Sequence, residues 1–200
     1  MKRSTLLSII LLLVIVVFAA AFTTKKTTTY KVDTEKSTLI WNGKKVAGEH
    51  LGTIKLKEGT LLLEGNKLKG GSFVIDMNTI TCSDLSNPAY NTKLVTHLKS
   101  DDFFSVEKFP EATLEITKAL PEKDTIYKIK GNITIKGITQ AIEFPATITH
   151  TENRVKATAK VAVNRAKHNV RYGSGSFFAN LGNKVIDDIF TLDVTLVANK

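Results

Sequence analysis

The sequence predicts an all-β protein, an antiparallel β-barrel with one short helix segment. Apolar and polar residues alternate with a period of two along most of the chain, which is the pattern of strands with one buried and one wet face. A helical spacing occurs in one segment, and strands do not alternate with helices. Such a chain forms a barrel or a sandwich. We favour the barrel, because one helix cannot cover two sheet faces and closure removes the exposed edges.

The N-terminal segment is typical of an export signal. Lys2 and Arg3 precede an apolar run over residues 6–22, and Ala19 and Ala21 fit the A-x-A cleavage pattern. The run is close to the roughly 20 residues that span a bilayer, so an uncleaved membrane anchor is the alternative. We expect export to the periplasm or cell envelope.

These features predict three parts of the chain. Residues 1–21 are assigned to a signal peptide or N-terminal anchor, residues 22–31 to a polar tether, and residues 32–200 to one barrel domain. A single domain is the expectation for this length.

Strands are expected wherever the alternation holds between turn residues. The clearest case is "TIYKIKGNITIKG", in which Tyr127, Ile129, Gly131, Ile133 and Ile135 share one face. The nine predicted strands cover residues 37–47, 49–59, 60–65, 71–80, 112–117, 125–137, 141–150, 154–163 and 187–197.

One amphipathic helix is expected in "NPAYNTKLVTHLKS". Asn87 is a suitable N-cap and Pro88 is suited to the first helical position. The predicted apolar face comprises Tyr90, Leu94, Val95 and Leu98.

The stretch "SDDFFSVEKFPEATLEIT" after this helix predicts a packed lid or rim at the end of the barrel. Phe103, Phe104 and Phe109 are too apolar for a surface loop, and Pro110 forces an extended entry into the next strand. Glu111 and Glu115 alternate with apolar residues, so they belong to the wet face of a strand and are not a catalytic pair.

The charge of the chain excludes one class of partner. The formal net charge is +9, and it falls to +7 without residues 1–21, but the lysines are spread along strands. A nucleic-acid site needs clustered basic residues interleaved with aromatics, so we expect no nucleic acid partner. Transient contact with an anionic membrane surface fits the charge better.

Few residues carry a catalytic or metal-binding pattern. The four histidines are scattered, and Cys82 has no histidine near it in the sequence. "YGSGSFF" contains neither a nucleophile elbow nor a phosphate-binding loop. We therefore expect no catalytic residue, no metal and no cofactor.

Several segments resemble the YceI-like family. The segments are "HLKSDDFFSVEKFPEATLEIT", "YKIKGNITIKGITQAIEFPATI", "WNGKKVAGEHLGTIKLKEGTL" and "LKGGSFVIDMNTI", and the resemblance covers residues 32–197. It implies a lipocalin-like barrel in the cell envelope, no catalysis, and a cavity that holds a polyisoprenoid or similar lipid. The expected role is storage or transport of that lipid, with an isoprenoid quinone or a polyprenyl chain as examples.

The interior positions of the predicted strands and the Phe-rich loops give the candidate ligand-binding residues. Small residues interleaved with bulky ones leave room for a ligand, or they relieve crowding in a tapered barrel. The candidates are Trp41, His50, Ile54, Phe73, Ile75, Met77, Phe103, Phe104, Ile129, Gly131, Ile133, Phe144, Ala157, Ala159, Phe177, Phe178 and Leu192.

Two other functions stay open at this point. One is a metal-dependent or stress-related envelope enzyme that uses His50 and His168. The other is a passive interaction module that docks through Phe177 and Phe178. A homodimer is also compatible with the sequence.

Overall fold

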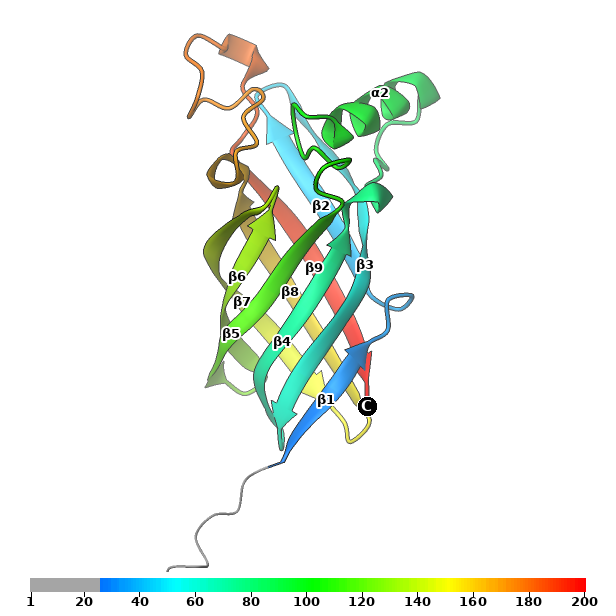
Figure 1. Ribbon diagram of the computed structural model, residues 1–200, viewed down its shortest axis with the longest axis vertical. Coiled ribbons are helices and arrows are strands. Elements are labelled where there is room, and N and C mark those ends of the chain that lie inside the picture. The colour runs from blue at the N-terminus through cyan, green and yellow to red at the C-terminus, as the bar shows by residue number, and fades with distance from the viewer. Residues whose placement is uncertain (1–25) are drawn as a thin grey trace, which may run out of the picture.

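The computed structural model describes residues 26–200, and the predicted signal peptide or anchor lies outside the described residues. The chain forms a closed antiparallel barrel with one α-helix above one end (Figure 1). This confirms the predicted fold class. None of the helices within residues 26–200 is long and apolar enough to cross a membrane. The strands are β1 (Thr27–Val32), β2 (Thr38–Lys45), β3 (Gly48–Glu64), β4 (Lys67–Asp76), β5 (Glu111–Lys123), β6 (Ile126–Ile135), β7 (Ile138–His150), β8 (Arg154–Asn164) and β9 (Ile189–Asn199).

The barrel closes because β3 is long enough to pair with three strands. Its first half pairs with β2, and its second half lies between β1 and β4. β1 and β2 therefore lie end to end along the same edge of β3, and both pair with β9 on their other side. The other strands follow in chain order from β4 to β9, so the wall is eight strands around.

Two of the predicted strands are one strand in the structure. Residues 49–59 and 60–64 both belong to β3, and the strand continues through Gly59. The β3–β4 register shifts between Leu56 and Glu58, where Lys57 is an extra residue in a β-bulge. The bulge reverses which residues point inward. Because the alternation of apolar residues changes phase there, the sequence pattern predicted two strands instead of one.

The polar tether is also shorter than predicted. Thr27–Val32 forms strand β1, of which only Tyr30 is buried, so its sequence lacks the expected alternation of apolar residues. Leu61 of β3 is the register partner of Tyr30. Hydrogen bonding to β3 thus orders a segment whose own composition predicts a loop.

The two ends of the barrel differ. The hairpin end carries the tight turns 64–67, 123–126 and 150–154, whereas the loop end carries residues 45–48, 77–110, 135–138 and 165–188. Figure 1 shows the helix and the long loops together at the loop end.

The predicted helix is α2 (Pro88–Lys99). The Asn87 side chain accepts hydrogen bonds from the amides of Ala89 and Tyr90, as expected of an N-cap. Leu98 is buried, but Tyr90 is 66% exposed and does not belong to the packed face. The lid after α2 is fixed by its own backbone, since the amide of Phe104 donates to the Leu98 carbonyl.

The hairpin end is packed shut. Leu63, Val155 and Ala198 have no exposed surface, and Tyr30 is 5% exposed. The Tyr30 hydroxyl donates to the Glu152 carbonyl in the β7–β8 turn at 3.1 Å, which ties β1 across this end. These contacts close the hairpin end of the barrel.

Candidate functional site

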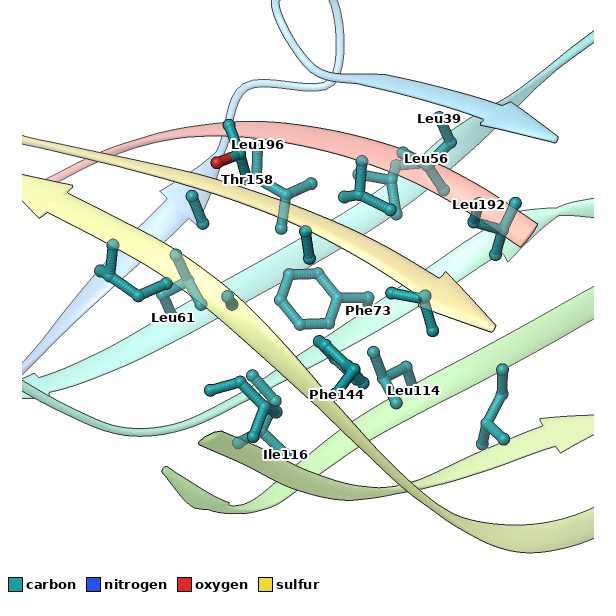
Figure 2. A pocket seen from close by; sticks show the side chains of 18 of the residues that line it. Leu39, Leu56, Leu61, Phe73, Leu114, Ile116, Phe144, Thr158, Leu192 and Leu196 are labelled. Atoms are coloured by element: carbon teal, nitrogen blue, oxygen red, sulfur yellow. The ribbon is translucent and has the colours of Figure 1, made fainter. Parts of the chain in front are cut away.

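The middle of the barrel encloses a cavity of about 90 Å³ (Figure 2). Aromatic rings from two strands, Phe73 of β4 and Phe144 of β7, lie in its wall together with small residues of β8, Ala157 and Ala159. Thr158 is the one polar residue of the lining. The full lining is Leu39, Leu56, Leu61, Leu68, Phe73, Ile75, Leu114, Ile116, Ile129, Ile133, Phe144, Ala146, Ile148, Ala157, Thr158, Ala159, Val161, Leu192, Val194 and Leu196.

A second cavity of about 110 Å³ lies beneath the loop end. Leu98 of α2 and Phe104 of the lid belong to its lining, so the helix and lid form its roof. Leu39, Ile75, Ile133 and Leu192 line both cavities, so the two adjoin at this level. Together they form an apolar space that extends from the barrel centre to the underside of the lid.

Twelve of the predicted ligand-binding residues line this space. They are Trp41, Ile54, Phe73, Ile75, Met77, Phe104, Ile129, Ile133, Phe144, Ala157, Ala159 and Leu192. The other five, His50, Phe103, Gly131, Phe177 and Phe178, do not line either cavity.

Gly131 contributes close packing and not cavity volume. A Cβ atom at this position would lie 2.4 Å from the Glu115 carbonyl oxygen of β5. The β5–β6 register shifts beside it, between Ile116 and Lys118. A glycine is needed here because the bulged strand approaches too closely for any side chain.

Phe103 is buried in the loop end, above the cavities. Its ring centroid lies 5.0 Å from that of His97 and 5.5 Å from that of Tyr172. The Arg165 guanidinium lies 5.8 Å from the ring centroid. Phe103 therefore fastens the lid to the 165–188 loop.

Phe177 and Phe178 lie on the surface of that loop, with exposures of 41% and 49%. The guanidinium of Arg171 lies 4.9 Å from the centroid of Phe177. Tyr172, also in this loop, is 46% exposed. These three rings lie at the surface of the loop end, and none of them lines either cavity.

The two histidines of the enzyme alternative have separate partners. His50 Nδ1 lies 2.7 Å from Asp84 Oδ2, whereas His168 is 2% exposed and its Nδ1 lies 2.9 Å from the Ile138 carbonyl oxygen. Burial lowers the pKa of His168, which favours the neutral ring. A site shared by His50 and His168 has no support in this arrangement.

Arg165 is the one basic side chain that lines the upper cavity. It is 3% exposed and donates hydrogen bonds of 2.9 Å to the carbonyls of Val170, Tyr172, Ile186 and Asp187. Asp188 Oδ1 lies 3.6 Å from its Nη2 atom. These hydrogen bonds hold the 165–188 loop over the barrel. The space below the guanidinium stays apolar.

Many lining residues were missed in the sequence, although alternation could have identified them. Leu39 stands two residues before Trp41 on β2, and Leu56 stands two after Ile54 on β3. Roof residues such as Ile186 had no periodic signal, since they come from loops.

Comparison with known proteins gives a consistent result. The family model of the YceI-like domain matches residues 30–198. Protein YceI of Salmonella arizonae is 30% identical over 123 residues, which cover 58% of this chain. The match spans 60% of that relative's length.

Solved structures share the fold at lower identity. BcnA of Burkholderia cenocepacia has a TM-score of 0.67 and 22% identity, with 84% of this chain and 99% of that chain covered. A polyisoprenoid binding domain from Saccharophagus degradans has a TM-score of 0.61 and 14% identity, with 85% and 97% covered. These likenesses show the barrel architecture.

Proposed function

We propose, since this chain belongs to the YceI-like family, that its barrel binds a long apolar lipid such as an isoprenoid quinone or a polyprenyl chain. The observation that carries the proposal is the apolar space between the packed hairpin end and the lid. The Saccharophagus neighbour is described as a polyisoprenoid binding domain, which supports the same ligand class. Storage or transport in the cell envelope is the proposed role.

The wall chemistry favours a hydrocarbon chain. Thr158 is exposed on the outer face of β8, and the other residues that line the lower cavity have no hydrogen-bonding side chain. A polar group placed there would lose its hydrogen bonds to water without replacement, at a cost of about 1–3 kcal/mol or more. A ligand would therefore place its chain in the barrel and its polar group near the loop end. The same wall lacks the acid, base or nucleophile that catalysis requires, which supports binding over an enzymatic role.

The bound lipid can be identified directly. We expect protein purified from its native envelope to release an isoprenoid-type lipid on solvent extraction, detected by mass spectrometry in an amount close to one per chain. Delipidated protein should take up added polyprenol. A native protein without lipid, which also fails to bind added polyprenol, would refute the proposal.

The loop end is also the proposed contact with a membrane surface. Tyr172, Phe177 and Phe178 are exposed there beside Arg171 and Lys184. Exposed rings enter the headgroup region, and basic side chains are attracted to anionic lipid. Lipid would then pass between a bilayer and the barrel through the loop end.

Vesicle flotation tests this contact. The Phe177→Ser/Phe178→Ser variant should bind anionic vesicles more weakly than the wild type. The control is Ile126→Ser, because Ile126 is 40% exposed at the opposite, hairpin end and should not matter. Equal flotation of all three proteins would contradict the assignment.

Export remains part of this proposal, because the predicted signal lies outside the described residues. If Ala21 is the processing site, the intact mass of the native protein should correspond to a chain that starts at Phe22. A full-length mass in the membrane fraction would support the anchor instead.

A further inference from the structure

The segment between η1 (Met77–Thr79) and α2 runs along the free edge of β3 at the loop end. The amide of Thr81 donates to the Thr53 carbonyl, and the amide of Ser83 donates to the Leu51 carbonyl, both at 2.9 Å. The Asp84 carboxylate in turn accepts from the Leu51 amide at 2.9 Å. This pairing continues the ladder beyond the end of β4 and places Cys82 and Asp84 beside His50.

Three different ligand types meet at this point. His50 Nδ1 lies 2.7 Å from Asp84 Oδ2, and Cys82 Sγ lies 3.2 Å from Asp84 Oδ1. One nitrogen, one sulfur and one oxygen atom of the three residues lie within 4.8 Å of one another. Zinc bonds of about 2.0–2.3 Å place the ligands of one tetrahedral ion roughly 3.3–3.8 Å apart, so side-chain movements of about 1 Å would let all three reach a single ion.

The arrangement does not suit a cysteine nucleophile. Such a nucleophile needs a base, usually a histidine, within hydrogen-bond distance of the sulfur. Here the Cys82 thiol donates to Asp84, and His50 lies on the other oxygen of the same carboxylate.

The Asp84 carboxylate faces both other side chains. Its Oδ2 lies 2.7 Å from His50 Nδ1, and its Oδ1 accepts from Cys82 at 3.2 Å and from the Leu51 amide at 2.9 Å. On metal binding the Cys82 sulfur would exchange its proton for the metal, and the proton would pass to the buffer.

We propose that His50, Cys82 and Asp84 form a binding site for a zinc ion, with a water molecule as the fourth ligand. A set of imidazole, thiolate and carboxylate matches the ligand preferences of zinc, and three protein ligands plus water is a common zinc geometry. The site lies outside both apolar cavities, since none of its three residues lines them. The ion would fasten the segment that leads into α2 to the edge of β3.

Cobalt gives a direct test, because it occupies zinc sites and shows a thiolate-to-metal absorption band. Cys82 is the one cysteine of the sequence, so such a band in the full chain reports this residue alone. We expect untagged, reduced, metal-free protein in non-ionic detergent to develop the band at one cobalt per chain and to lose it when zinc is added. A wild-type protein without this band, or a band that zinc does not displace, would overturn the proposal.

Calorimetric titration with zinc then tests the other two ligands. Cys82→Ser, His50→Gln and Asp84→Asn should each weaken zinc binding at least tenfold. The matched control is His97→Gln, because His97 Nε2 lies 3.3 Å from Asp102 Oδ2 in a histidine–aspartate pair at the same end that lacks a cysteine. Affinities in the three variants equal to the wild type would refute the site. Lipid content of each variant, measured in parallel, keeps this result separate from the proposed lipid function.

Discussion

Replacing Ala157 by phenylalanine distinguishes a ligand cavity from an ordinary packed core. Ala157 points inward from β8, is 6% exposed and lies in the wall of the lower cavity. The new ring would project into space that holds no protein atoms and that a lipid chain is proposed to occupy. We therefore expect Ala157→Phe to preserve the fold and to abolish most lipid binding.

The magnitude follows from the volume of the cavity. Cavities cost about 24 cal/mol per Å³, so filling the whole 90 Å³ would raise the free energy of unfolding by at most ~2 kcal/mol. A ring fills an irregular space incompletely, so the expected gain for lipid-free protein lies between zero and that limit. Lipid at ~100 times its dissociation constant should stabilise the wild type by about 2.7 kcal/mol, and the variant should lose most of this gain.

Denaturant titrations of both proteins, with and without polyprenol, measure these quantities. The matched control is Ala198→Phe, since Ala198 is fully buried in the packed hairpin end and lines neither cavity. Overpacking there should cost about 1–3 kcal/mol or more. The reasoning would be refuted if Ala157→Phe were destabilised as strongly as this control and the wild type did not respond to lipid.

Three further substitutions test the loop end and the wall. Arg165→Leu should cost about 3 kcal/mol or more in urea denaturation, because it leaves four backbone carbonyls without their donor, whereas Arg171→Leu on the surface should cost under ~1 kcal/mol. Burial holds the pKa of His168 in the folded protein below 6.5. The contribution of the neutral ring to the free energy of unfolding is therefore complete above pH 6.5. It declines as the pH falls further, because the unfolded chain then binds the proton more readily than the folded chain. The urea midpoint of His168→Gln should therefore change less between pH 7 and pH 5 than that of the wild type; parallel pH profiles would contradict this. Gly131→Ala should cost about 1–3 kcal/mol in the same assay, since its Cβ would meet the Glu115 carbonyl oxygen, and an unchanged midpoint would show that β5 can move aside.

Alternation predicted the barrel because a closed wall has one apolar and one wet side along nearly every strand. In β6, Tyr127, Ile129, Ile133 and Ile135 are buried, as their spacing predicts. The pattern failed at the bulge of β3, where Lys57 reverses the phase, and no local signal in the sequence identifies a bulge.

Site residues could be predicted better on strands than in loops. Phe104 lines the cavity and Phe103 does not, although they are adjacent and both apolar, because the lid backbone determines which ring points down. The proximity of His50 and Cys82 was likewise hidden, since it arises from the register between β3 and a loop thirty residues away in the sequence. The number of residues between two positions in the sequence is a poor guide to their contact in the structure when strands are antiparallel and long.

The position of β1 bears on the direction in which this barrel would face. The described chain enters the barrel at the hairpin end, where Thr27 pairs with Glu64, while the lid lies at the opposite end (Figure 1). β3 alone has 17 residues, which at ~3.3 Å each and a ~40° tilt gives a wall about 40 Å tall. If residues 1–21 stay in a membrane, residues 22–26 reach at most ~18 Å, too little for the barrel to turn its lid back toward that membrane. An anchored protein would therefore present its lid to a surface opposite the anchoring membrane, as a bridge between two membranes does. A released protein could present its lid to either membrane.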